Sequence, residues 1–134
     1  MKNKTKPGIV EDSEDNRFLV QAFLKNTNYL IDIAENGQVA IEKFLANVYD
    51  LILMHMQMPV MDGYTATRKI RRLESEEGRK HNPIIALTAN ALHEDLQKSL
   101  SAGCDVHLTK PVRKKDLLEA IQEFVTSGLE GEKS

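Results

Sequence analysis

Short apolar runs that alternate with amphipathic stretches constrain the fold of this chain more than any other feature. The apolar runs in the middle of the chain are continuous, as in strands that are covered on both faces. Strands that alternate with helical patterns are typical of βαβ units around a parallel sheet. The sequence therefore predicts an α/β fold, a doubly wound parallel sheet, with strands at Pro7–Val10, Tyr29–Ala34, Leu51–Met54, Ile84–Leu87 and Val106–Leu108.

The stretches between these strands have the apolar period of ~3.6 residues that marks helices. Asp62 is placed to cap the third helix. Helices are predicted at Glu14–Lys25, Gln38–Ala46 and Tyr64–Glu77, and around the periodic residues Leu92 to Leu100 and Leu117 to Val125. The length of 134 residues suits one domain, which we expect over residues 1–127, followed by a polar tail at residues 128–134.

Composition and charge exclude several classes of protein. The formal net charge of −2 gives no overall attraction to nucleic acid. No apolar run approaches the ~20 residues of a membrane span, and the basic start of the chain lacks the apolar core of a signal peptide. The single cysteine, Cys104, excludes an internal disulfide and fits a reducing compartment. We expect a cytoplasmic protein that binds neither nucleic acid nor a membrane.

Polar residues follow directly after most of the predicted strands. The carboxyl ends of parallel strands meet at one edge of the sheet, where such folds bind ligands, so we expect one site built from Glu11, Asp12, His55, Thr88 and Lys110. Two adjacent acids need a cation between them and suit Mg²⁺, and Lys110 can neutralise them when no metal is bound. Either acid can instead cap the helix that follows. Thr88 and Lys110 offer a hydroxyl and a positive charge for the oxygens of a phosphoryl group. The Lys110-Pro111 bond is a candidate for a cis peptide.

The chain resembles the receiver domain of two-component response regulators over most of its length, from Lys6 to Val125. The resemblance rests on the motifs Val10–Asp12, Tyr49–Met54, Met58–Gly63, Pro83–Asn90, Ala102–Asp105 and Leu108–Pro111. The residues in these motifs look most like those in the receivers of hybrid histidine kinases. The resemblance implies a flavodoxin-like (βα)5 fold with strand order 2-1-3-4-5.

In this family an aspartate after the third strand accepts a phosphoryl group from a phosphohistidine. Mg²⁺ is held there by that aspartate, the acidic pair and a backbone carbonyl. The matching positions in this sequence are, for the metal, Glu11, Asp12 and the carbonyl of Gln57; for the switch and the phosphate, Thr88, His107 and Lys110; and for the phosphoacceptor, His55.

His55 is the main departure from the family pattern. An imidazole cannot form an aspartyl phosphate, and a hard cation binds nitrogen poorly, so Mg²⁺ is expected to bind more weakly here. Together with Glu11 and Asp12 the imidazole forms a ligand set that suits Mn²⁺, Fe²⁺ or Zn²⁺; alternatively, a cationic His55 pairs with the two acids. His107 stands where the family usually has Tyr or Phe, so the two histidines reflect either drift or a pH-sensitive pair.

These features predict an atypical receiver that acts as a protein-interaction module and not as an enzyme. Its partners are expected to be a histidine kinase or phosphotransfer protein, an effector protein, or both, bound on the face formed by Leu92–Ala102, Val106–Leu108 and Arg113–Val125. One alternative is an ordinary phosphoaccepting receiver in which His55 is a recent or deliberate substitution for aspartate. Another is a receiver that binds metal at His55 or carries the phosphoryl group on it.

Overall fold

The computed structural model describes residues 5–58, 60–89 and 92–133, and their side chains as far as residue 125. Parts of the Met58–Gly63 and Pro83–Asn90 motifs therefore lie outside the described residues. Ten elements alternate along the chain: β1 (Pro7–Val10), α1 (Glu14–Leu24), β2 (Asp32–Ala34), α2 (Gly37–Ala46), β3 (Leu51–His55), α3 (Gly63–Glu77), β4 (Ile84–Thr88), α4 (His93–Ala102), β5 (Val106–Thr109) and α5 (Lys114–Lys133).

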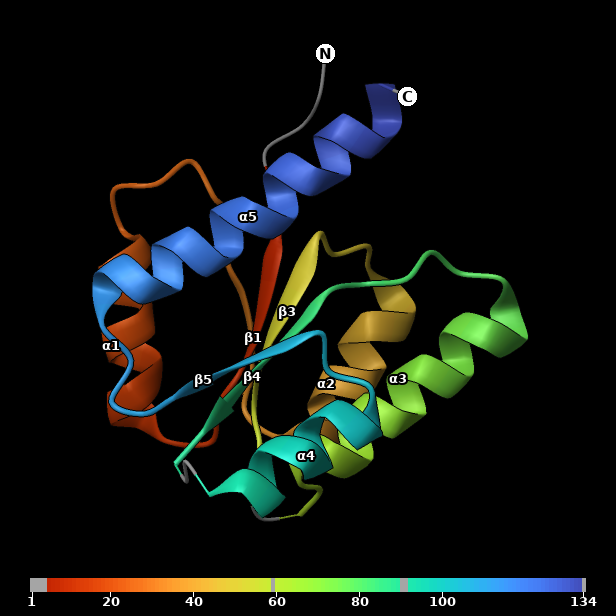
Figure 1. Ribbon diagram of the computed structural model, residues 1–134, viewed down its shortest axis with the longest axis horizontal. Coiled ribbons are helices and arrows are strands. Elements are labelled where there is room, and N and C mark those ends of the chain that lie inside the picture. Colours follow the sequence, from red (N-terminus) through yellow and green to blue (C-terminus); the bar gives the residue numbers. More distant parts are fainter. Residues whose placement is uncertain (1–4, 59, 90–91, 134) are drawn as a thin grey trace.

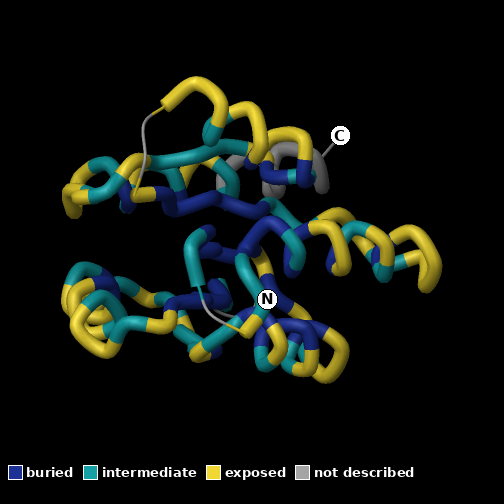
Figure 2. The backbone as a smooth tube through the Cα atoms, turned by 90° about the horizontal axis from the view of Figure 1, so that it is seen from below, coloured by how far each residue is buried: buried dark blue, intermediate teal, exposed yellow. Residues whose placement is uncertain are grey.

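The five strands form one parallel sheet in the order β2-β1-β3-β4-β5. This order confirms the predicted doubly wound α/β fold. Helices α1 and α5 cover one face of the sheet, and α2, α3 and α4 cover the other (Figure 1). The tube view shows that the buried backbone lies along the sheet between these two layers of helices, while the outer turns of the helices are exposed (Figure 2).

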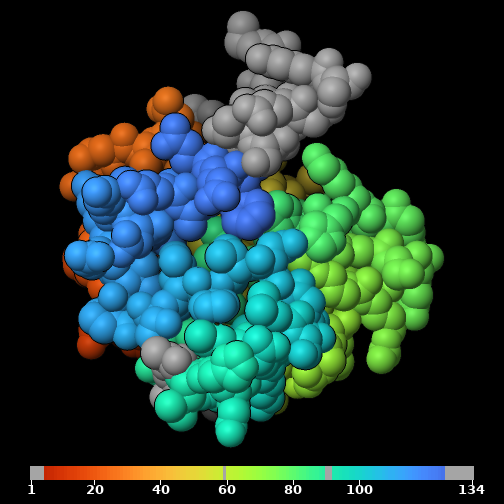
Figure 3. All heavy atoms as spheres, in the orientation of Figure 1, coloured from red at the N-terminus to blue at the C-terminus, as the bar shows by residue number. Residues whose placement is uncertain are grey.

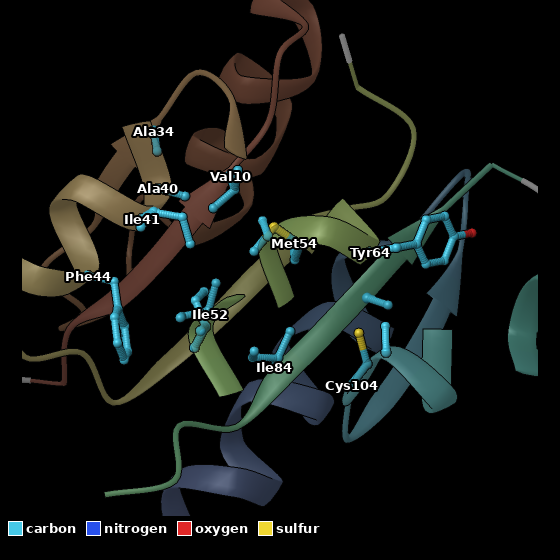
Figure 4. Packing of buried hydrophobic residues seen from close by; sticks show 14 of the residues in the cluster. Val10, Ala34, Ala40, Ile41, Phe44, Ile52, Met54, Tyr64, Ile84 and Cys104 are labelled. Carbon is cyan, nitrogen blue, oxygen red and sulfur yellow. The ribbon is translucent and has the colours of Figure 1, made fainter. Parts of the chain in front are cut away.

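Each face of the sheet has its own hydrophobic core. The cluster beneath α2, α3 and α4 includes Phe44, Ile52 and Ile84 (Figure 4). The cluster beneath α1 and α5 includes Leu53, Leu87 and Ile121. Successive residues of β3 and β4 enter opposite cores because side chains alternate across a strand, which explains the continuous apolar runs in these two strands.

The second strand is shorter than the sequence indicated. It begins at Asp32 and not at Tyr29, so the prediction was wrong at its start. The Thr27 hydroxyl donates to the carbonyl of Leu24 at 2.6 Å and accepts from the Tyr29 backbone N–H at 3.3 Å. These bonds shape the turn that ends α1. Residues 29–31, which follow it, belong to neither a helix nor a strand, although their apolar side chains look like those of a strand. The other predicted strands are right to within one residue at their ends.

Polar side chains begin three of the helices. Asp62 caps α3 as predicted, because its carboxylate accepts from the Thr65 backbone N–H at 2.8 Å. Ser13 caps α1 and Asn36 caps α2 in the same way. At the other end of the chain α5 continues as helix to Lys133, so most of the predicted polar tail is helical. The domain boundary at residue 127 stays a prediction.

The connection between β3 and α3 is tight and partly strained. Gly63 donates its backbone N–H to the carbonyl of Met56 at 2.8 Å, and a Cβ on Gly63 would collide with the carbonyl of His55. Val60 has a φ of 71°, in the left-handed region, and its side chain is 83% exposed. A branched residue is costly in this conformation, so the loop holds Val60 outward at some expense in stability.

Candidate functional site

The carboxyl ends of three strands bring distant ionisable residues together at one edge of the sheet. Glu11 directly follows β1, His55 is the last residue of β3, and Lys110 follows β5. Parallel strands all end at the same edge, and β1 lies beside β3. The predicted convergence of Glu11, His55 and Lys110 is therefore confirmed.

Lys110 makes the shortest contacts in this cluster. Its ammonium nitrogen Nζ lies 2.8 Å from Glu11 Oε1 and 2.6 Å from His55 Nδ1. The Glu11 side chain is only 1% exposed, and a buried carboxylate needs a partner of opposite charge. Lys110 supplies that charge. The peptide bond between Lys110 and Pro111 is cis, as the sequence indicated.

The imidazole of His55 is buried between the acids and the lysine. Its Nδ1 lies 3.5 Å from Glu11 Oε1, and its Nε2 lies 3.8 Å from Asp12 Oδ1. Burial lowers the pKa of His55; Glu11 and Asp12 raise it, and Lys110 lowers it further. The net result is a pKa below the usual value, so the ring is neutral near neutral pH. The acids lie where a cationic His55 would pair with them, but Lys110 and not His55 neutralises Glu11.

Two further residues hold the loop after β1, and the sequence interpretation had missed their roles. Arg17 donates to the carbonyls of Glu11 and Asp12, both at 3.0 Å. The Ser13 backbone N–H donates to Glu11 Oε2 at 3.2 Å. The position of Arg17, one turn after the cap Ser13, was the available signal, because a long side chain there folds back over the loop. Glu11 thus binds both Lys110 and the Ser13 backbone, but the cap of α1 is Ser13 and neither of the two acids.

Thr88 and Gln57 form a second, adjoining part of the site. Gln57 Nε2 lies 3.3 Å from the Tyr64 hydroxyl and 3.4 Å from Thr88 Oγ1. Its Oε1 accepts from the Ala89 backbone N–H at 3.2 Å. The side chain of Gln57 therefore ties β4 to the loop after β3. The sequence interpretation gave a role only to its backbone carbonyl.

His107 and Cys104 lie outside this cluster of contacts. His107 is in β5 opposite Ala86, and its buried Nδ1 has no hydrogen-bond partner among the described residues. Cys104 follows α4 and is buried, its Sγ lying 3.8 Å from Thr67 Oγ1. Burial raises the pKa of this thiol, so it stays protonated and unreactive near neutral pH.

Residues 8–122 match the response regulator receiver domain, and the chain belongs to this family. It is 43% identical over 118 residues to hybrid signal transduction histidine kinase B of Dictyostelium discoideum. It is 37% identical over 115 residues to the sensor protein GacS of Pseudomonas syringae pv. syringae. These matches cover 82% and 86% of this chain but 6% and 13% of the two relatives. The chain therefore spans a small part of the curated relatives it matches.

Solved structures agree with this assignment. The receiver domain of the sensor histidine kinase PA1611 from Pseudomonas aeruginosa PAO1 has a TM-score of 0.82 and 34% identity, over 92% of this chain and 99% of that chain. That structure has a magnesium ion coordinated in its active site cleft. A co-crystal structure of the Saccharomyces cerevisiae phosphotransfer protein Ypd1 and the receiver domain of Ssk1 gives a TM-score of 0.85 and 33% identity, over 92% of this chain and 90% of that chain.

The donor set of this chain does not fit a magnesium ion well. Mg²⁺ requires oxygen ligands in near-octahedral geometry. Here the two carboxylates stand beside an imidazole, and Lys110 already binds one oxygen of Glu11. Among the described residues, no helix has both the length and the apolar character needed to cross a bilayer.

Proposed function

We propose that this chain is an atypical receiver of a two-component phosphorelay, a pseudo-receiver that works through protein contacts and not as an enzyme. His55 takes the phosphoacceptor position, so the domain is not phosphorylated on aspartate. It binds a histidine kinase or phosphotransfer protein, an effector, or both, in the cytoplasm. Membership of the receiver family and the similarity to a receiver crystallised with a phosphotransfer protein support the pathway.

The contact between Lys110 and His55 carries this proposal. An ammonium group only donates hydrogen bonds, so His55 Nδ1 must accept at 2.6 Å. The lone pair of Nδ1 is then engaged, and Nε2 faces the carboxylate of Asp12, which repels an incoming phosphoryl group. Neither nitrogen is placed to accept phosphate, and this disfavours the alternative of a phosphorylated His55.

The proposed docking face is formed by α4, β5 and α5. These elements lie side by side on one face of the molecule (Figure 3). Leu92, just before α4, and Leu100 within it are exposed apolar residues, and Arg113, just before α5, is exposed. Exposed apolar residues with charged residues around them are common in protein interfaces.

The substitution His55→Asp tests the proposal. Because Glu11, Asp12, Thr88 and Lys110 are all in place, we expect the variant to gain one phosphoryl group from acetyl phosphate in the presence of Mg²⁺. In that step a carboxylate oxygen bonds to phosphorus as the bond from phosphorus to the acetate oxygen breaks. Intact-mass spectrometry measures the adduct, with the wild type and His55→Asn as controls that should gain none.

One result would contradict the proposal. An adduct on His55 of the wild type, recognised by its loss in acid, would show that the imidazole does carry phosphate. A His55→Asp protein that is folded but inert would leave the pseudo-receiver in place and show that its pocket has departed from the family pattern at more than His55. If instead the gene encodes aspartate at this position, the alternative of an ordinary phosphoaccepting receiver is correct.

A second candidate function is the binding of a transition-metal ion. It is favoured by the placement of Glu11, Asp12 and His55, whose ligand atoms all lie within 4.8 Å of one another. Two carboxylates and one imidazole suit Mn²⁺, Fe²⁺ or Zn²⁺ better than Mg²⁺. The binding of such an ion depends on whether Lys110 keeps its contact with Glu11.

A further inference from the structure

The charges at the carboxyl edge are already partly balanced without a metal. Glu11 and Asp12 contribute two negative charges, and Lys110 contributes one positive charge in direct contact with Glu11 Oε1 at 2.8 Å. A divalent ion on the same oxygen would lie close to this ammonium group in a site that is mostly shielded from water. Like charges at such short range repel strongly, so Lys110 and a metal compete for Glu11.

Lys110 also fixes the imidazole in the tautomer that cannot bind a metal through Nε2, the nitrogen that faces Asp12. Since Nδ1 accepts from the ammonium group at 2.6 Å, the hydrogen of the neutral ring is on Nε2. That nitrogen faces Asp12 at 3.8 Å, which is the side from which an ion would be shared with the acid. A metal ligand needs a bare nitrogen, and a histidine that binds metal normally donates its other N–H to an acceptor. Lys110 imposes the reverse arrangement.

Without Lys110 the same side chains meet the requirements of a metal site. The ring is free to move its hydrogen to Nδ1 and to donate it to Glu11, whose Oε1 lies 3.5 Å from Nδ1. Nε2 and Asp12 Oδ1 lie 3.8 Å apart, and one ligand atom from each of Glu11, Asp12 and His55 lies within 4.8 Å of the other two. Bond lengths of about 2.0–2.2 Å from Zn²⁺ to nitrogen and oxygen require only a small closure of this cluster.

We infer that the ammonium group of Lys110 is the resident cation of this site, and that it blocks a latent transition-metal site formed by Glu11, Asp12 and His55. The inference rests on the second candidate function above and adds how metal binding is regulated. In the folded wild type the lysine takes the place of the metal. The site can bind a metal ion once this one positive charge is removed or drawn to another anion.

The test is a titration of Zn²⁺ by calorimetry into the wild type and Lys110→Gln, with Co²⁺ absorption as a second readout that reports nitrogen ligation. Gln can still donate to Glu11, so the fold should be retained. We expect Lys110→Gln to bind one Zn²⁺ at least tenfold more tightly than the wild type. In the double variant Lys110→Gln/His55→Ala this gain should be lost.

Three further variants separate the local charge of Lys110 from net charge and from the chemistry of the replacing side chain. Lys43 lies outside the site and binds Asp32, with Nζ 3.1 Å from Oδ1. Lys43→Gln removes the same charge as Lys110→Gln and should bind Zn²⁺ as the wild type does, which controls for net charge. Lys110→Arg keeps the positive charge and should bind Zn²⁺ no more tightly than the wild type. Leucine has no ligand atom, so Lys110→Leu shows whether the Gln amide itself binds the metal. It also replaces Lys110→Gln if that variant does not fold.

The inference is overturned if the wild type binds Zn²⁺ as tightly as Lys110→Gln. It is also overturned if the gain survives the loss of His55. Neither result depends on phosphorylation of His55→Asp, so failure of this inference and failure of the proposed receiver function are told apart by separate measurements.

Discussion

His55 shows how one side chain is kept neutral among charged neighbours. Its side chain is 9% exposed, and burial favours the uncharged form of an imidazole. Glu11 and Asp12 pull the pKa of His55 upward, but burial and Lys110 together keep it below the usual value. Protonation of the ring would also place two donors against each other at the Lys110 contact.

This environment predicts a loss of stability in mild acid. The pKa of His55 is lower in the folded chain than in the unfolded chain, so the unfolded state binds the proton more readily. The contribution of the neutral ring to stability is complete above the unfolded pKa of about 6.5 and is lost as the pH falls below it towards the folded pKa. Urea unfolding at pH 7.5 and pH 5.5, followed by far-ultraviolet circular dichroism, measures the effect.

The substitution His55→Asn provides the control for this prediction. Asn does not titrate, while His81, His93 and His107 remain in both proteins, so their contributions cancel in the comparison. The drop in the urea midpoint between the two pH values should be smaller in the variant. An equal or larger drop in His55→Asn would assign the pH dependence to other groups.

The loop between β3 and α3 illustrates the cost of one backbone conformation. Val60 is held at a φ of 71° with its side chain exposed, and a residue with a Cβ pays about 1–2 kcal/mol there. Glycine avoids this cost but loses about 0.5–1 kcal/mol of chain entropy. We expect Val60→Gly to raise the free energy of unfolding by about 0.5–1 kcal/mol, measured by urea unfolding.

A second exposed valine is the matched control for this substitution. Val48 is 86% exposed, compared with 83% for Val60, and φ is not positive at Val48. Val48→Gly should therefore lower the free energy of unfolding by about 0.5–1 kcal/mol. Two changes of the same sign would show that the conformation of Val60 is not the cause.

The helices and strands that could be predicted were those whose apolar pattern fits only one kind of element. The runs of β3 and β4 lie between turn residues and are covered on both faces, so their position followed from the sequence. The start of β2 did not, because residues 29–31 are apolar like a strand, yet the pairing with β1 begins only at Asp32. Local pattern does not reveal the Thr27 hydrogen bonds that shape the preceding turn.

The candidate site was predictable in its members but not in its contacts. The rule that strand ends meet at one edge selected Glu11, His55 and Lys110 correctly. It could not show that Lys110 would bind the ring of His55 as well as Glu11, since this depends on the reach of a flexible side chain. The same reason hid the bonds of Arg17 and of the Gln57 amide.

At the scale of the whole molecule, stability rests on the two cores and not on exposed apolar residues. Phe44 is 2% exposed in the core beneath α2, α3 and α4, whereas Phe18 on α1 is 73% exposed. We expect Phe44→Ala to lower the free energy of unfolding by about 3–5 kcal/mol. Phe18→Ala removes the same atoms and should change it by no more than about 0.5 kcal/mol.

Urea unfolding followed by circular dichroism measures both variants, since the chain has no tryptophan to report by fluorescence. Similar losses in the two variants would mean that Phe18 is packed in solution. A small loss in Phe44→Ala would mean that the core beneath α2, α3 and α4 collapses around the missing ring.

The bond between Glu11 and Lys110 joins residues that are 99 positions apart in the chain. Closing so large a loop is slow and costs entropy before any contact repays it. During synthesis, Glu11 and His55 leave the ribosome well before Lys110 does. Glu11 lacks its counter-charge until β5 has joined the sheet, so the pocket can be completed only together with the fold.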